Sequence, residues 1–144
     1  MTKDELKKRL HAYRDLEAER LQIVQELERV GDRMTAPRGP NMDGMPRSPG
    51  AGDPVLGVVS QHMALEERYQ RQLEKLAAAQ SDIEDMIEGL DPVARKLMRH
   101  RYIEGKPWEA VCVAVGYSWR QTHNLHAAAL DKILERYEEA GANV

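Results

Sequence analysis

The sequence is poor in the residues that build large, rigid cores. It contains no phenylalanine, one cysteine and only 5% aromatic residues, against 42% hydrophobic and 31% charged residues. This balance is typical of amphipathic helices that share thin cores, and 144 residues leave room for one ordinary domain with a helical attachment. The lone Cys112 excludes an intramolecular disulfide, and its apolar surroundings predict a small core side chain.

Long apolar runs are also absent. No stretch approaches the roughly 18 consecutive apolar residues of a membrane-spanning helix. The opening residues, MTKDELKKRLHAY, are too densely charged for a secretion signal. We therefore expect a cytoplasmic protein without membrane contact.

An excess of positive charge is missing as well. The net charge is −3, and it is unevenly distributed: residues 1–90 hold 13 basic and 17 acidic side chains, whereas residues 91–144 hold 8 and 7. This argues against a strongly basic nucleic-acid binder. Any DNA affinity of the second segment is expected to be modest and sensitive to salt.

Residues 1–30 are predicted to form an amphipathic helix. Thr2 and Glu5 match the capping-box pattern at its start, and Gly31 suits its C-terminal cap. Its apolar stripe has helical spacing and comprises Leu6, Leu10, Tyr13, Leu16, Ile23, Val24, Leu27 and Val30. Residues 31–53 are rich in Pro, Gly and Met and are predicted to be a flexible linker, with an ordered ligand loop or partner site as the alternative.

A second long amphipathic helix is predicted over residues 54–90. Asp53 and Pro54 suit its cap and first turn, and apolar residues recur every three or four positions for roughly ten turns. Helices of this kind bury their stripes by pairing, either antiparallel within one chain or between subunits. We therefore predict an all-α protein whose long N-terminal helical hairpin or coiled coil also assembles a homo-oligomer.

Residues 91–138 carry the signals of three shorter helices, followed by a tail at 139–144. Caps, first turns and breaks are marked by Asp91, Pro92, Gly105, Trp108, Gly116 and Ser118. Gly116 can take the positive φ that a tight turn between steeply crossing helices requires. In the short middle helix the residues expected to face inward are Ala110, Val111, Val113 and Ala114.

The stretch RYIEGKPWEAVCVAVGYSWRQTHNLHAAALDKIL resembles region 4 of sigma-70-type transcription factors. The resemblance covers residues 91–137 and lies in the combination of an Arg-Tyr helix end, a Trp-Glu helix start, a Gly-Tyr-Ser turn and an Ala-Leu-Asp-Lys-Ile tail. More loosely, the whole chain resembles phage late-transcription regulators of the RinA and ArpU type. These resemblances imply a C-terminal helix-turn-helix domain, promoter binding, contact with host RNA polymerase and, for a phage protein, a place in the bacterial host cytoplasm.

A recognition helix points its first turns into the major groove, which is wide enough for one α-helix. Here the candidate DNA-binding residues on those turns are Ser118, Trp119, Arg120, Gln121, His123 and Asn124. Arg suits guanine, Gln and Asn suit adenine, and a Ser at a helix N-terminus can hold a phosphate. Contacts to the flanking double-stranded DNA backbone are expected from Arg95, Lys96, Arg99 and Lys106.

The chain departs from the region 4 pattern in two respects. Thr122 stands where an apolar residue is common, and several exposed positions that usually hold Arg have other residues. The chain also lacks the region 2 elements that melt promoter DNA. The resemblance therefore does not imply a stand-alone sigma factor.

The predicted function is a sequence-specific, DNA-binding transcription regulator. Two alternatives stay open: a DNA-packaging or assembly protein like a small terminase subunit, and a module that contacts RNA polymerase without binding DNA. The sequence lacks a phosphate-cradling glycine loop, a His-Glu metal motif and a nucleophile elbow, so neither an enzyme nor a cofactor is expected. His123 and His126 have no Cys or carboxylate partner in their motif, and no metal site is predicted.

Overall fold

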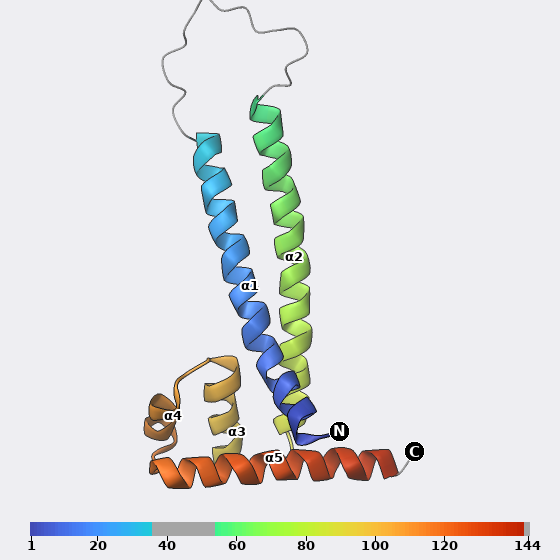
Figure 1. Cartoon of the computed structure of the whole chain (residues 1–144), viewed down its shortest axis with the longest axis vertical. Coiled ribbons are helices and arrows are strands. Elements are labelled where there is room, and N and C mark those ends of the chain that lie inside the picture. The colour runs from blue at the N-terminus through green and yellow to red at the C-terminus, as the bar shows by residue number, and fades with distance from the viewer. Residues whose placement is uncertain (36–53, 143–144) are drawn as a thin grey trace, which may run out of the picture. The chain divides into compact units, whose positions relative to one another are not determined.

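The computed structural model describes residues 1–35 and 54–142, and within them every regular element is helical (Figure 1). The elements are α1 (Lys3–Thr35), α2 (Pro54–Ile87), α3 (Pro92–Met98), the π-helical turn η1 (Arg99–Ile103), α4 (Trp108–Val115) and α5 (Trp119–Ala142). The predicted all-α class is confirmed for these residues. Most of the predicted linker, residues 36–53, lies outside them.

Helix α1 begins where the sequence predicts and ends later. The backbone N–H of Thr2 donates to the Glu5 carboxylate at 2.9 Å, and the N–H of Glu5 donates to the Thr2 hydroxyl oxygen at 3.2 Å, which completes a capping box. The predicted end at residue 30 with a Gly31 cap is wrong, because α1 continues to Thr35. Gly31 does not take a positive φ, and the Thr35 hydroxyl donates to its carbonyl at 3.1 Å.

The far end of α5 also differs from the prediction. Residues 139–142 continue the helix to Ala142 instead of starting a tail. Glu138, Glu139 and Ala140 are all exposed, so this last turn is not held by burial. Residues 138–140 contain neither Pro nor Gly, so no helix breaker precedes Gly141.

The chain divides into two compact units, Met1–Glu17 with Lys75–Val144, and Ala18–Glu74. We call them the first and the second unit. This division differs from the predicted boundaries at 30 and 91, because the first turns of α1 and the last turns of α2 share a core with the C-terminal helices. Sequence patterns report helices one at a time and carry little information about such long-range packing.

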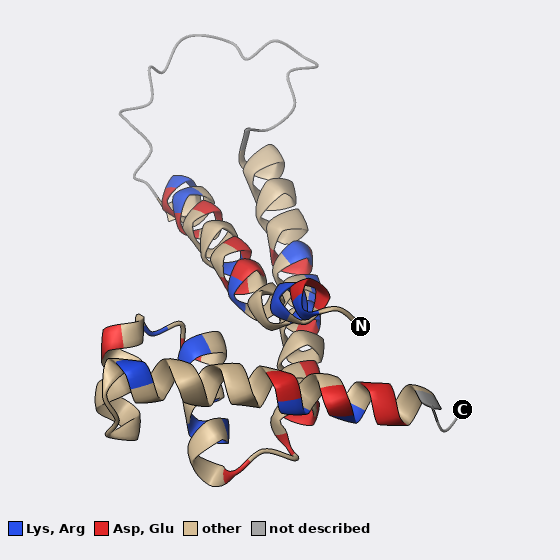
Figure 2. Ribbon diagram, turned by 60° about the horizontal axis from the view of Figure 1, so that its bottom comes forward, with Lys and Arg blue, Asp and Glu red and all other residues tan. Residues whose placement is uncertain are grey.

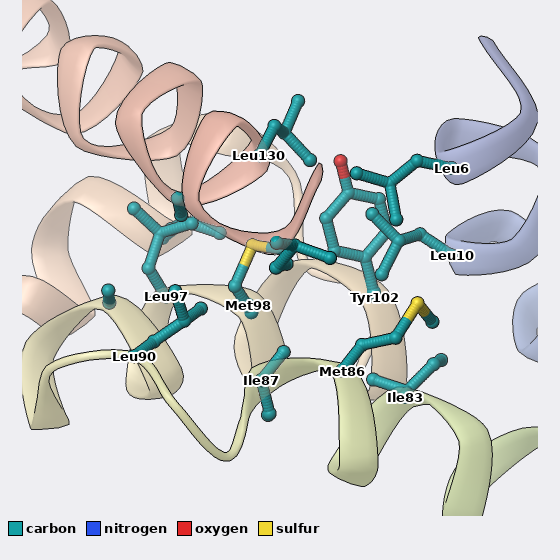
Figure 3. Close-up of a cluster of buried hydrophobic side chains, with 14 residues drawn as sticks. Leu6, Leu10, Ile83, Met86, Ile87, Leu90, Leu97, Met98, Tyr102 and Leu130 are labelled. Atoms are coloured by element: carbon teal, nitrogen blue, oxygen red, sulfur yellow. The ribbon is translucent and has the colours of Figure 1, made fainter. Parts of the chain in front are cut away.

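The core of the first unit draws on all its helices (Figure 3). Leu6 and Leu10 of α1 and Ile83 and Met86 of α2 point toward Tyr102 in the close-up, and all five side chains are buried. The remaining buried members are Ile87, Leu90, Ala94, Leu97, Met98, Val111, Ala129, Leu130 and Ile133. At about 25 cal/mol for each Å² of apolar surface removed from water, this shared core is the main stabilising contribution to the unit.

In the second unit, α1 and α2 lie side by side and run in opposite directions (Figure 1). Ile23, Val30 and Leu65 are buried between them. Gln72 is also buried, and its side-chain amide donates to the Glu19 carboxylate at 3.1 Å. This bond satisfies a polar group that would otherwise destabilise the apolar contact.

Candidate nucleic-acid interface

The N-terminus of α5 is fixed by its cap and by the turn before it. Gly116 has φ +75°, and its N–H donates to the Cys112 carbonyl at 2.9 Å, which closes α4. Ser118 and Gln121 then form a capping box: the Ser118 N–H donates to the Gln121 side-chain oxygen at 3.1 Å, and the Gln121 N–H donates to the Ser118 hydroxyl oxygen at 3.2 Å. Gln121, predicted to bind a base, is therefore engaged as a cap in this structure.

The first three turns of α5 present an outward face without acidic residues. Arg120 and Asn124 are exposed on it, and the small side chains of Ala127 and Ala128 follow. No Asp or Glu occurs between Trp119 and Leu130. The rest of the helix contains four acidic residues, and the red segments of α5 in Figure 2 all lie in its C-terminal half. A surface able to approach a polyanion is thus confined to the beginning of α5.

Trp119 and His123 differ in how far they reach the surface. Trp119 keeps 52% of its surface exposed, and its ring lies 4.5 Å from that of His123. His123 also contacts Trp108 at 4.4 Å between ring centroids, and its Nε2 is buried without a hydrogen-bond partner. The predicted DNA contact of His123 is not supported by this placement, because the imidazole is held between two indoles.

The ring contacts continue inward from Trp108 to Tyr102 of η1. Trp108 packs against His126 at 4.8 Å and lies 4.7 Å from the Arg101 guanidinium, a cation–π contact. The Tyr102 hydroxyl is hydrogen-bonded to Nε2 of His126. Rings therefore follow one another from buried Tyr102 to exposed Trp119, and we call these five residues (Tyr102, His126, Trp108, His123 and Trp119) the ring series.

Two of the predicted phosphate-binding side chains have acidic partners. Arg99 donates two hydrogen bonds to the Glu84 carboxylate, at 3.1 and 2.7 Å, and this pairing lowers the pKa of Glu84. Lys106 Nζ lies 3.0 Å from the Glu104 carboxylate, and Lys106 and then His100 lower the pKa of Glu104. A phosphate would have to compete with these carboxylates at both positions.

The other two predicted backbone contacts lie on α3. Lys96 is exposed and Arg95 is half-buried. α3 packs directly against α5. The ten predicted site residues thus all belong to the first unit, and five of them, Ser118, Trp119, Arg120, Gln121 and Asn124, gather at the exposed start of α5.

The structure also bears on two side chains that were expected to face inward, Val113 and Cys112. Val113, expected to face inward on α4, is 83% exposed, because a helix of eight residues that is apolar nearly throughout does not reveal its buried side. Cys112 is half-buried. In the described parts of the chain, no three His, Cys, Asp or Glu side chains come together as metal ligands do, and none of the helices combines the length and apolar character needed to cross a membrane.

No protein-family model matches the chain. Neither a curated protein nor a solved structure matches it. The geometry of the first unit and the resemblance of its sequence to region 4 are therefore the grounds for a proposed function.

Three features of the interface were missed by sequence reasoning. The Ser-x-x-Gln spacing of a capping box was present in the sequence, and it would have assigned Gln121 to the cap. Ala127 and Ala128 were not singled out, although small residues on an exposed helix face permit close approach of a partner. The contact between Trp108 and His123 had no sequence signal, since the two residues lie on different helices.

Proposed function

We propose that this chain is a sequence-specific DNA-binding protein that inserts the first three turns of α5 into the major groove. The observation that carries the proposal is the exposed, acid-free face of α5, on which Arg120 and Asn124 lie one turn apart. A major groove admits one α-helix, and these two side chains have the hydrogen-bonding groups that read guanine and adenine.

The way α5 is held supports this role. Its capping box and the αL turn at Gly116 fix the start of the helix, and Ala129, Leu130 and Ile133 bury its opposite side in the core. A reading helix gains from such rigidity, since side chains that are already ordered lose less entropy on binding. The N-terminus of α5 also carries the positive end of the helix dipole, which favours a nearby phosphate.

The two helices α4 and α5, with the turn at Gly116 between them, fit the helix-turn-helix that the resemblance to region 4 implies. On that resemblance we extend the proposal to a transcription regulator of phage type that binds promoters and contacts host RNA polymerase. Residues 91–144 hold only 8 basic against 7 acidic side chains, and this near balance is consistent with a protein that reaches useful affinity only as an oligomer on paired half-sites.

We propose α1 and α2 as the elements that assemble this homo-oligomer. Within the second unit Leu21, Leu56 and Met63 are large apolar side chains that stay exposed, Leu56 by 65%. A second copy of the chain would remove these three side chains from water. Light scattering tests the assembly directly. A monomer at all concentrations up to those used for DNA binding would contradict the assembly, while leaving DNA binding by one subunit possible.

The experiment for DNA binding uses the purified protein and a fluorescent library of fragments from its own genome neighbourhood, at low and physiological salt. We expect selective binding that weakens as salt rises. Arg120→Ala and Asn124→Ala should each weaken binding to the selected fragment about tenfold or more, the range of a bidentate base contact. Lys132→Ala is the matched control, because it removes the same charge from the acidic half of α5 and should change affinity less.

One observation favours a second candidate, a module that contacts RNA polymerase or another protein and not DNA. Val113 and Tyr117, beside the start of α5, are both exposed, and tyrosine is among the residues enriched in protein interfaces. Absence of DNA binding at low salt, together with binding to purified polymerase that Val113→Asp abolishes, would overturn the first proposal in favour of this one.

A further inference from the structure

The exposed indole of Trp119 differs in chemistry from the polar side chains beside it at the start of α5. It lies at the first residue of α5, beside Arg120, and 52% of its surface is exposed. Its neighbours on the exposed face, Arg120 and Asn124, can read bases through hydrogen bonds. The indole has a single N–H donor and no acceptor, so most of what it offers a partner is apolar surface.

The ring series holds this indole in place. Trp119 packs on His123, His123 on Trp108, and Trp108 on His126, with centroid distances of 4.5, 4.4 and 4.8 Å. The series ends at Tyr102, which is 3% exposed in the core. A large apolar surface that stays exposed while its other side is packed against rings is already ordered for contact, which reduces the entropy cost of binding.

We infer that Trp119 reads thymine through its 5-methyl group in the major groove. The inference rests on the proposed DNA-binding function and names the base chemistry that the site would select. Among the base edges in the major groove, thymine alone carries an apolar group, and apolar side chains make contact with it. The acid-free turns of α5 and exposed Arg120 place the indole on the part of the helix whose charge suits DNA.

The test uses the duplex that the wild-type protein selects, with each thymine replaced singly by deoxyuracil. This replacement removes one methyl group and leaves every hydrogen-bonding group of the base pair in place. We expect one position, or one in each half-site, at which the replacement weakens binding about fourfold, the effect of burying one methyl-sized group. In Trp119→Ala the thymine and deoxyuracil duplexes should bind equally at that position.

Two further variants make the result specific. Trp119→Leu restores an apolar side chain and should recover part of the preference for thymine, whereas Val93→Ala, which trims an exposed apolar residue on α3, should leave the full preference intact. Circular dichroism and thermal unfolding of Trp119→Ala confirm that the unit is folded when its binding is measured.

The outcomes separate this inference from the proposed function. Binding to duplex DNA without any thymine position that responds to deoxyuracil would overturn the role of Trp119 and leave the DNA-binding proposal standing. A response of the same size in wild type and in Trp119→Ala would assign the methyl contact to another residue and overturn the inference as well. Failure to bind any duplex at low salt would overturn both.

Discussion

The hydroxyl of Tyr102 lies 2.6 Å from Nε2 of His126 and joins η1 to α5 inside the first unit. Burial raises the pKa of Tyr102 to about 12 and lowers the pKa of His126 to about 4. Both groups are therefore neutral at pH 7, and the bond connects a neutral hydroxyl to a neutral imidazole. This bond also anchors the inner end of the ring series that leads to Trp119.

Tyr102→Phe should lower the free energy of unfolding by about 1–3 kcal/mol, because it leaves Nε2 of His126 without its partner in a largely buried position. Urea denaturation at pH 7 measures the change. Tyr137→Phe is the comparison. Among the described residues the Tyr137 hydroxyl takes part only in a long 3.4 Å contact with Arg9, so this substitution should lower the free energy of unfolding by less. Equal losses in the two variants would contradict the importance assigned to the Tyr102–His126 bond.

Acid should destabilise the first unit through His126. Its folded pKa is about 4, lowered first by burial and then by the positive charges of His123, Lys7, Arg101 and Lys3, whereas the ordinary value is 6.5. Between these values the unfolded chain binds a proton that the folded chain does not, so stability is complete above about pH 6.5 and falls as the pH drops toward 4.

His126→Gln keeps a hydrogen-bond acceptor for Tyr102 but does not titrate. The free energy of unfolding of this variant should therefore depend less steeply on pH between 6.5 and 4 than that of the wild type. Glu84 and Glu104, whose pKa values are lowered by their basic partners, contribute equally to both proteins and cancel in the comparison. Parallel stability curves would show that His126 is not the group responsible.

Local signals in the sequence predict caps and turns correctly. They do not predict which side chains of different helices come into contact. The capping box at Thr2 and the left-handed Gly116 were both predicted, because each depends on a few neighbouring residues. The outward orientation of Val113 and the enclosure of His123 were not predicted, because each depends on which helix packs opposite. The start of α5 was found as a candidate site since its chemistry lies within seven consecutive residues, 118–124.

Thr122→Val should stabilise the protein. Thr122 is fully buried, and its hydroxyl oxygen has no hydrogen-bond partner among the described residues, so the desolvated hydroxyl weakens the folded state. Valine has nearly the same shape and removes that cost, with an expected gain of about 1 kcal/mol in thermal or urea unfolding. Thr2→Val should instead lower the free energy of unfolding by about 1 kcal/mol, because the Thr2 hydroxyl caps α1. A loss of stability in Thr122→Val would mean that the hydroxyl is satisfied in solution.

Gly105 and Gly116 form a matched pair for substitution by alanine. Their φ angles are +69° and +75°. An alanine in this left-handed conformation lowers the free energy of unfolding by about 1–2 kcal/mol at either position. A Cβ at Gly116 would meet no atom within 4 Å, whereas one at Gly105 would lie 2.4 Å from Nε of Arg14. That guanidinium would have to move and give up its hydrogen bond to the Ile103 carbonyl. Gly105→Ala should thus cost more than Gly116→Ala in urea unfolding, and equal costs would show that Arg14 relocates freely.

The C-terminal helices should depend on α1 for their stability. Leu10 is fully buried in the same core as Leu97 and Leu130, so Leu10→Ala should cost about 2–5 kcal/mol, whereas Met34→Ala at an exposed position of the same helix should cost far less. For the same reason a fragment of residues 91–144 should not fold alone, since it lacks the α1 and α2 side chains that cover its core. Loss of helical circular dichroism and of dispersed amide resonances in that fragment is the expected result. A fragment that folds and binds the selected duplex like the whole chain would instead restore the independent C-terminal domain that the sequence alone suggests.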